Sequence, residues 1–276
     1  MMKLAMPVSP YPTFPRKREK GQTNAYAHFT LTTRPEWLLV RRIMTTIASN
    51  LQATRAAIAD AATACGRAPQ DIELLAVSKT FPADAVREAY GAGQRRFAEN
   101  YLQEGLDKIA ALQGLQIEWH FIGPIQSNKT RPIAEHFDWV HGIERLKVAE
   151  RLSAQRPTGL PPLQVCLQVN VSGEASKSGV PPEQAEALAR GIAALPNLRL
   201  RGLMAIPAPS DDVTEQRAAF AQLRILFEQL NRQNLQLDTL SMGMSHDFPA
   251  AVAEGATLVR IGTAIFGNRI YHKETT

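Results

Sequence analysis

The sequence predicts an α/β protein built as a single (β/α)8 barrel of the TIM type, with an extra helix before its first strand. Short β-like runs alternate with helical patterns from Met44 onward, and eight such units can be counted. Several runs are almost continuously apolar, such as 74–77 and 163–169, as strands covered on both faces must be. A doubly wound open sheet fits less well, because no GxGxxG turn follows the first strand.

The expected elements follow one another along the chain. The opening helix covers about 45–64, and Gly66 is its stop signal. The expected strands are 74–78, 96–98, 119–122, 139–142, 164–170, 201–206, 239–242 and 258–261. Helices are expected at 83–91, 101–112, 144–155, 183–194 and 214–231. The helix after the third strand should begin near Thr130 or be kinked there by Pro132.

Residues 1–43 do not fit this pattern, because prolines interrupt any helix there. Met44 directly precedes the first patterned helix, so our hypothesis is that translation begins at Met44. Residues 1–43 would then be a disordered leader or an upstream artefact, and an Arg-rich transit peptide is the alternative. The barrel is expected to occupy residues 44–276, since no linker marks a second domain.

Charge and cysteine content exclude several classes of partner. The sequence has 31 Lys and Arg and 26 Asp and Glu, and eight of these bases and two of these acids lie in residues 1–43. The remaining 23 bases and 24 acids leave the barrel nearly neutral, so no nucleic acid is expected. No apolar run approaches the roughly 18–20 residues of a membrane span, so no membrane partner is expected. Cys65 and Cys166 lack disulfide or metal spacing and predict two buried free thiols in a reducing cytoplasm, without a metal site.

In a barrel, a ligand meets the loops that follow the carboxyl ends of the strands. Polar residues fall at these ends, together with a Gly-Thr turn: Ser78, Lys79, Glu99, Asn100, His141, Asn170, Ser245, Gly262 and Thr263. Lys79 follows the apolar run Leu-Leu-Ala-Val-Ser, so its side chain should rise from a dry interior, where burial favours a nucleophilic amine of the kind that forms Schiff bases. From position alone, a structural ion pair with Glu99 is an equally good interpretation.

The segment Arg260–Gly267 ends a strand and opens a helix, which is a possible phosphate site. Gly262 permits close backbone approach, N–H groups of Gly262 and Thr263 together with the helix dipole favour an anion, and Ser245 can add a hydroxyl. The alternative is a plain turn. Strand alternation points Arg260 inward, either toward the ring nitrogen of a ligand or into an ion pair with a barrel carboxylate.

Five stretches of this sequence resemble the pyridoxal phosphate homeostasis protein family. They are LLAVSKTFPADAVREAYGAGQRRFAENYLQEG (74–105), EWHFIGPIQSNK (118–129), SKSG (176–179), RGLMAI (201–206) and SMGMSHDFPAAVAEGATLVRIGTAIFG (241–267). The resemblance runs in order from about Met44 to the C-terminus. It departs at His246, where family members commonly have Asp or a small residue.

The resemblance implies a barrel like the N-terminal domain of alanine racemases that binds pyridoxal 5'-phosphate (PLP) on Lys79. It further implies that Asn100 lies near the ring hydroxyl and Arg260 at the pyridine nitrogen. Ser245, Gly262 and Thr263 are then expected around the phosphate.

The resemblance also implies a cytoplasmic role in PLP homeostasis, with PLP-dependent apo-enzymes as possible recipients of the cofactor. We expect no efficient turnover, because a two-base racemase needs a second acid or base opposite Lys79, and the sequence offers His120 or His141 only as poor substitutes. Lys177 in the loop 172–179 is a candidate amine for PLP in transit. A racemase and a cofactor-free class I aldolase remain as alternatives, and a monomer is expected.

Overall fold

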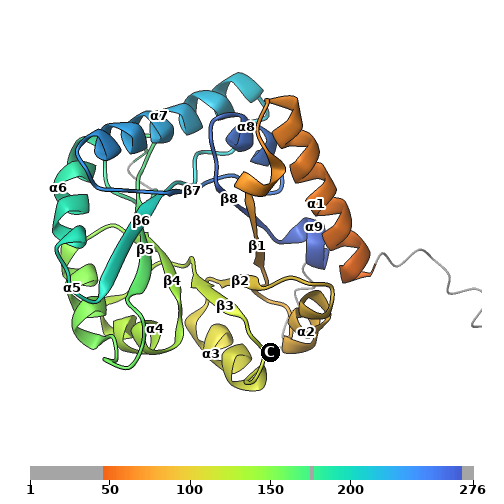
Figure 1. Ribbon diagram of the computed structural model, residues 1–276, viewed down its shortest axis with the longest axis horizontal. Helices are drawn as coiled ribbons and strands as arrows, with labels where there is room; N and C mark the ends of the chain where they lie inside the picture. The colour runs from red at the N-terminus through yellow and green to blue at the C-terminus, as the bar shows by residue number, and fades with distance from the viewer. Residues whose placement is uncertain (1–45, 175–176, 269–276) are drawn as a thin grey trace, which may run out of the picture. The chain divides into compact units, whose positions relative to one another are not determined.

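The computed structural model describes residues 46–174 and 177–268, and the predicted leader 1–43 lies outside the described residues. Eight parallel strands close into a barrel in the order β1-β2-β3-β4-β5-β6-β7-β8, and helices surround it (Figure 1). The strands are β1 (Glu73–Val77), β2 (Arg96–Glu99), β3 (Glu118–Phe121), β4 (Trp139–Ile143), β5 (Leu163–Gln168), β6 (Leu198–Met204), β7 (Thr239–Ser241) and β8 (Leu258–Ile261). The predicted (β/α)8 barrel is confirmed.

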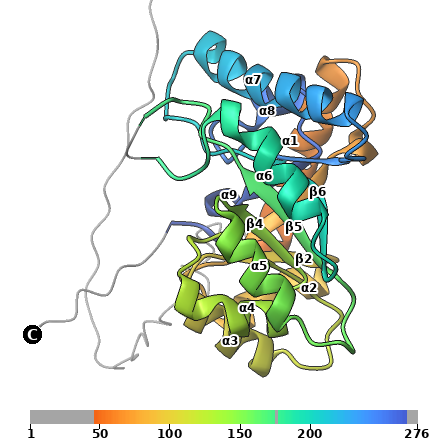
Figure 2. The same cartoon turned by 90° about the vertical axis from the view of Figure 1, so that its left-hand side faces the viewer.

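The helices alternate with these strands, as parallel neighbours require. They are α1 (Ile47–Ala64), α2 (Ala83–Gly91), α3 (Leu102–Ala111), α4 (Thr130–His136), α5 (Leu146–Gln155), α6 (Pro182–Ala193), α7 (Val213–Arg232), α8 (Phe248–Ala253) and α9 (Thr263–Phe266), with 3₁₀ turns η2 (Pro69–Asp71) and η3 (Ser127–Lys129). The side view shows α4, α5 and α6 along one wall of the barrel (Figure 2). The extra helix α1 packs against α2, α8 and α9 on the outside of the barrel. In the described part of the chain, no helix is long and apolar enough to cross a membrane.

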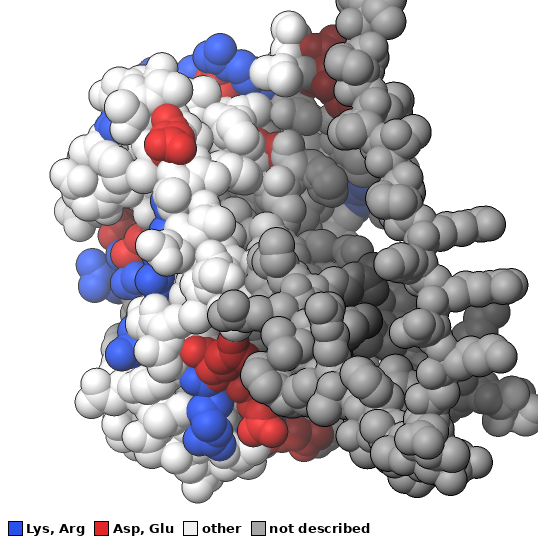
Figure 3. Space-filling view, turned by 90° about the vertical axis from the view of Figure 1, so that its right-hand side faces the viewer, with Lys and Arg blue, Asp and Glu red and all other residues white. Residues whose placement is uncertain are grey.

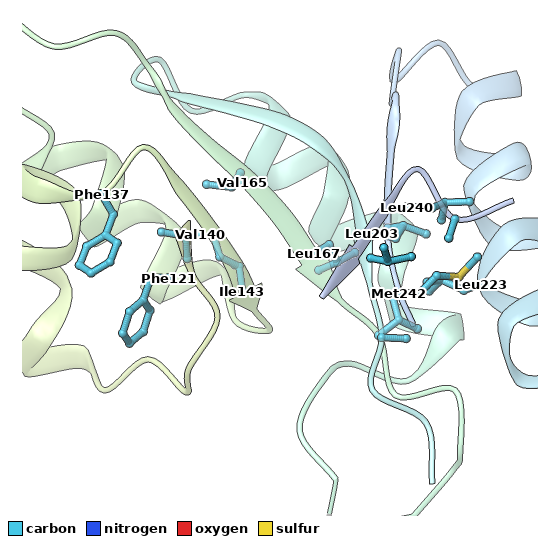
Figure 4. Close-up of a cluster of buried hydrophobic side chains, with 14 of the residues drawn as sticks. Phe121, Phe137, Val140, Ile143, Val165, Leu167, Leu203, Leu223, Leu240 and Met242 are labelled. Atoms are coloured by element: carbon cyan, nitrogen blue, oxygen red, sulfur yellow. The ribbon is translucent and has the colours of Figure 1, made fainter. Parts of the chain in front are cut away.

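The main hydrophobic core lies between the strands and the helices. Outward-facing side chains of neighbouring strands pack there, including Val140 and Ile143 of β4 and Leu167 of β5 (Figure 4). Phe121 and Phe137 meet edge to face, with ring centroids 5.3 Å apart. Successive side chains of a strand point to opposite faces, so the outward positions can form this core while the inward positions of the same strands carry polar groups.

Two predictions about strands and cysteines need correction. Strand β6 begins at Leu198 rather than residue 201, and a register shift between Val165 and Cys166 of β5 lets the two strands stay paired. Cys166 is fully buried, as expected, but Cys65 is exposed because it caps the C-terminus of α1.

The described surface carries charges of both signs. On the described part of the face shown in Figure 3, Lys and Arg side chains lie beside Asp and Glu side chains. Many of the exposed pairs are within a single helix, such as Arg190 with Glu186. This distribution agrees with the nearly neutral charge counted for residues 44–276.

Candidate functional site

A cavity of about 260 Å³ opens at the carboxyl ends of the strands. The residues that line it come from several strands and from the loops that follow them: Val77, Lys79, Phe81, Asn100, Ile122, Ile206, Met244, Ser245, His246, Arg260, Gly262 and Thr263. All six residues predicted to bind the cofactor lie in this lining. The structure therefore brings together side chains that are separated by as much as 184 positions in the sequence.

Lys79 lies two residues beyond the last residue of β1, and it is half-buried. The next residue, Thr80, has φ of 68°, a left-handed conformation that is uncommon for a threonine. Its N–H donates to Glu104 Oε2 at 2.8 Å, and Lys108 Nζ donates to the carbonyl of Ser78 at 2.7 Å. Two side chains of α3 thus hold the backbone on both sides of Lys79.

A buried ion pair supports the same turn from outside the barrel. Glu99 Oε1 accepts from Lys108 Nζ at 2.7 Å and from Ser78 Oγ at 2.6 Å. Burial raises the pKa of the Glu99 carboxyl above its ordinary value, although the charge of Lys108 acts against this. Sequence reasoning missed Lys108 because nothing in its local pattern distinguishes a buried lysine from a solvated one.

Asn100 directly follows β2 and lines the cavity, and one of its side-chain polar atoms is unsatisfied. Its Oδ1 is buried and has no hydrogen-bond partner among the described residues. Gly123 packs against it so closely that an added Cβ would lie 2.2 Å from the Asn100 carbonyl oxygen. A buried amide oxygen that lacks a partner is suited to a ligand that completes its hydrogen bonding.

Arg260 points into the barrel, as the alternation of β8 predicted, and it is almost fully buried. Its Nη1 donates to the Ser241 carbonyl at 2.5 Å and to Ser241 Oγ at 2.8 Å, and its Nη2 donates to the Ala205 carbonyl at 2.9 Å. Burial lowers the pKa of Arg260 to about 10. The alternative of an ion pair with a barrel carboxylate is wrong within the described residues, because a hydroxyl and two carbonyls take its hydrogen bonds.

The turn after β8 also lines the cavity, and β8 pairs with β1. Gly262 approaches β1 so closely that an added Cβ would lie 2.9 Å from the Val77 carbonyl oxygen, which explains the glycine. Thr263 begins α9, and the first N–H groups of a helix have no acceptor within that helix. Ser245 lines the cavity beside them. Since α9 has only four residues, these N–H groups rather than a long helix dipole would attract an anion.

Comparison with known proteins places the chain in a family. Residues 47–269 match the family "Alanine racemase, N-terminal domain". The pyridoxal phosphate homeostasis protein of Pseudomonas aeruginosa is 66% identical over 228 residues, which are 83% of this chain and 98% of that protein. The protein of the same name from Escherichia coli K12 is 56% identical over 234 residues, 84% of this chain and all of that protein. This chain belongs to the pyridoxal phosphate homeostasis protein family.

A solved structure extends the comparison to the barrel. PipY of Synechococcus elongatus PCC7942, in a structure described as having PLP bound, is 40% identical, with a TM-score of 0.70. The match covers 80% of this chain and the whole of that one. The family resemblance inferred from the sequence motifs is confirmed, and so is the barrel fold.

Other strand-end residues do not reach the cavity of this family member. His141 lies within β4 and is fully buried in the barrel interior. Asn170 lies beyond β5, where its Nδ2 donates to the Glu174 carbonyl at 2.8 Å. Lys177 is half-buried, and it is not among the described residues that line the cavity.

The apolar wall of the cavity was not predicted. Ile122, Ile206 and Met244 line it, and Phe81 contacts Phe266 with ring centroids 5.2 Å apart. Ile122 and Met244 lie within the family-like stretches, so their position at strand ends could have indicated this wall. The site therefore combines an apolar wall with a few converging polar groups, as small-molecule sites generally do.

Proposed function

We propose that this protein binds PLP on Lys79 and acts in PLP homeostasis, holding and releasing the cofactor without efficient turnover. The observation that carries this proposal is the convergence of all six predicted residues on one cavity. Its relatives from Pseudomonas and Escherichia bear the name of PLP homeostasis proteins, and PipY has been solved with PLP. These similarities support the same ligand here.

The residues of the cavity match the parts of PLP one by one. PLP supplies an aldehyde that reacts reversibly with a primary amine, and Lys79 presents such an amine as its Schiff-base partner. Asn100 would bind beside the ring hydroxyl. Backbone N–H groups at Gly262 and Thr263 would receive the phosphate, with the Ser245 hydroxyl beside them.

Arg260 would donate to the pyridine nitrogen. Three hydrogen bonds occupy part of its five-donor guanidinium, which leaves two N–H groups for the cavity that it lines. A cation at the ring nitrogen opposes its protonation, so the ring withdraws electrons less strongly. This favours holding the cofactor over carbanion chemistry.

The arrangement of the histidines supports a carrier over a two-base racemase. His120 and His141 are fully buried and hydrogen-bonded inside the barrel, so neither offers a free base at the cavity. His246 lines the cavity in the loop after β7, next to Ser245 in the sequence, and is the residue whose role as a base the turnover experiment tests. The remaining alternative is a class I aldolase, in which the same lysine would form a Schiff base with the substrate and no cofactor would be needed.

We further propose a monomer in the cytoplasm, in which residues 44–276 form the folded unit and PLP-dependent apo-enzymes receive the cofactor. Light scattering on the purified chain checks the first point. The intact mass of protein from its native source checks the start at Met44, since a mature chain that retains Met1 would refute it.

The deciding experiment records the visible absorption spectrum of the purified chain before and after borohydride reduction, for the wild type and for Lys79→Ala. We expect a yellow protein whose cofactor becomes permanently attached on reduction, and a variant that borohydride does not label. Lys147→Ala is the matched control, because Lys147 is an exposed lysine on α5. A colourless wild type that also ignores added PLP would refute PLP binding and favour the aldolase.

Turnover separates the carrier from the racemase. Incubation of the PLP-loaded protein with L-amino acids, followed by chiral chromatography, should give no product above the level of free PLP. Rapid racemisation that is lost in Lys79→Ala or His246→Gln would establish an enzyme instead.

A further inference from the structure

A chain of hydrogen bonds crosses the interior of the barrel from its amino end to the cavity. Glu118 Oε1 lies 2.8 Å from His120 Nε2, and His120 Nδ1 lies 2.9 Å from His141 Nε2. His141 Nδ1 lies 2.8 Å from Ser241 Oγ, which accepts from Arg260 Nη1 at 2.8 Å. We call these five residues of β3, β4, β7 and β8 the interior chain.

The two ends of the interior chain determine the direction of its hydrogen bonds. An ionised carboxylate only accepts, so His120 Nε2 must carry a hydrogen and donate to Glu118. In a neutral imidazole the other nitrogen then accepts, which makes His141 Nε2 the next donor. His141 Nδ1 therefore accepts from the Ser241 hydroxyl, whose oxygen lone pair receives the Arg260 guanidinium. Every hydrogen bond points from Arg260 toward Glu118.

Burial favours the neutral imidazoles that this direction needs. The two histidines and Ser241 are fully buried, and Trp139 stacks on His120 with ring centroids 5.3 Å apart. Burial lowers the pKa of both histidines below the ordinary value, and the Arg260 charge acts in the same sense on His141. Around His120, the charges of Glu118 and Asp138 favour protonation and that of Arg96 opposes it. With both imidazoles neutral, the hydrogen bonds at the two ends of the interior chain are satisfied without a positive charge on either buried histidine.

We propose that Ser241, His141, His120 and Glu118 are positioning residues that act as one directional hydrogen-bond chain to orient Arg260 toward the ligand. The inference deepens the proposed function, because it rests on Arg260 being the partner of the ring nitrogen. Without the Ser241 hydroxyl, Arg260 would keep its hydrogen bonds to two carbonyls but lose the third acceptor that helps to fix the orientation of its guanidinium plane. The hydrogen bonds of the interior chain are present whether or not PLP is the ligand.

The direction can be tested without PLP. The full chain is labelled with ¹⁵N-histidine, and two-bond ¹H–¹⁵N spectra assign the hydrogen on each ring between pH 5.5 and 8. His120 and His141 should both remain neutral with the hydrogen on Nε2, whereas the exposed His246 serves as an internal reference. A hydrogen on Nδ1 of either interior histidine, or protonation within this range, would overturn the proposed direction.

A variant of Glu118, at the amino end of the interior chain, tests whether a change at one end affects the residues further along it. Glu118→Gln should shift the ring nitrogen resonances of both His120 and His141, because it removes the charge that polarises the chain. Glu73→Gln is the matched control, since Glu73 also pairs with Arg96, at 3.0 Å, but contacts neither histidine. Unchanged His141 resonances in Glu118→Gln would show that the residues do not act as one chain.

The positioning of Arg260 is tested by measuring PLP binding after its hydroxyl partner Ser241 is changed. Ser241→Ala should raise the Kd for PLP by about tenfold and move its absorption maximum, while borohydride still attaches the cofactor to Lys79. Thr239→Val is the matched control, because it removes a buried hydroxyl two residues earlier on β7 that bonds to Asp238 instead. An unchanged Kd and spectrum in Ser241→Ala would refute positioning. If the wild type binds no PLP, the proposed function is refuted. The histidine spectra then still test the hydrogen-bond direction of the interior chain, because they do not depend on PLP.

Discussion

Replacing Lys108 with methionine should destabilise the barrel in a pH-dependent way. Lys108 and Glu99 are both buried, with Nζ 2.7 Å from Oε1, and Oε2 of Glu99 has no hydrogen-bond partner among the described residues. Methionine keeps the apolar stem but removes the ammonium group, so the Ser78 hydroxyl is left as the partner of the carboxylate. Removing one member of a buried ion pair typically costs about 3–5 kcal/mol.

Proton uptake by Glu99 limits this cost. Neutralising a carboxyl group with the ordinary pKa of 4.5 costs about 3.4 kcal/mol at pH 7 and about 0.7 kcal/mol at pH 5. Burial already raises the pKa of Glu99, and the substitution removes the charge that most opposes this rise. The variant therefore binds its proton at higher pH than the wild type. We expect the loss in free energy of unfolding to be about 3 kcal/mol at pH 7 and about 1 kcal/mol at pH 5.

Urea unfolding followed by circular dichroism at both pH values measures these losses. Lys147→Met, which changes an exposed lysine on α5, should change the stability little at either pH. The double variant Glu99→Gln, Lys108→Met should regain much of the stability at pH 7, because no buried charge remains. Equal losses at pH 7 and pH 5 would contradict the reasoning, since they would mean that an uncompensated carboxylate is not the cause.

Three further predictions concern the cavity, the interior chain and the thiols. Gly123→Ala should cost about 1–3 kcal/mol of stability and weaken PLP binding, because its Cβ would lie 2.2 Å from the Asn100 carbonyl oxygen, whereas Gly159→Ala, in open space, should do neither. Burial lowers the pKa of the two interior histidines, so the unfolded protein binds protons before the folded protein does as pH falls below about 6.5. The free energy of unfolding, measured by urea unfolding, should therefore fall by up to about 1.4 kcal/mol per histidine and pH unit. Iodoacetamide should label exposed Cys65 in the folded protein but spare Cys166, whose pKa burial raises to about 12; mass spectrometry checks this.

The sequence was sufficient to predict the barrel where its local patterns were regular. Strand β8 and helix α2 have the predicted bounds, since Gly262 directly follows β8 and Pro82 directly precedes α2. The start of β6 was missed because Arg199 and Arg201 interrupt its apolar pattern. Short helices such as α9 are too brief to show a helical period.

The candidate site was predictable to the extent that strand ends converge in a barrel. That rule alone places Lys79 and Arg260 near one another, and the family-like stretches added their expected roles. The interior chain could not be predicted, because its partners belong to different strands: His141 and Ser241 are 100 positions apart. A histidine within an apolar strand looks the same in sequence whether it is a catalytic base or a buried link.

Buried polar groups support the cavity from two sides. The Lys108–Glu99 pair holds the turn at Lys79 from outside the barrel, and the interior chain holds Arg260 from within. Both sets of hydrogen bonds exist before a ligand arrives, so binding does not need to order these side chains, and less affinity is lost to their conformational entropy. A preorganised site with an apolar wall can hold a reactive aldehyde reversibly without a mobile acid–base pair. This is the property that the proposed carrier role needs.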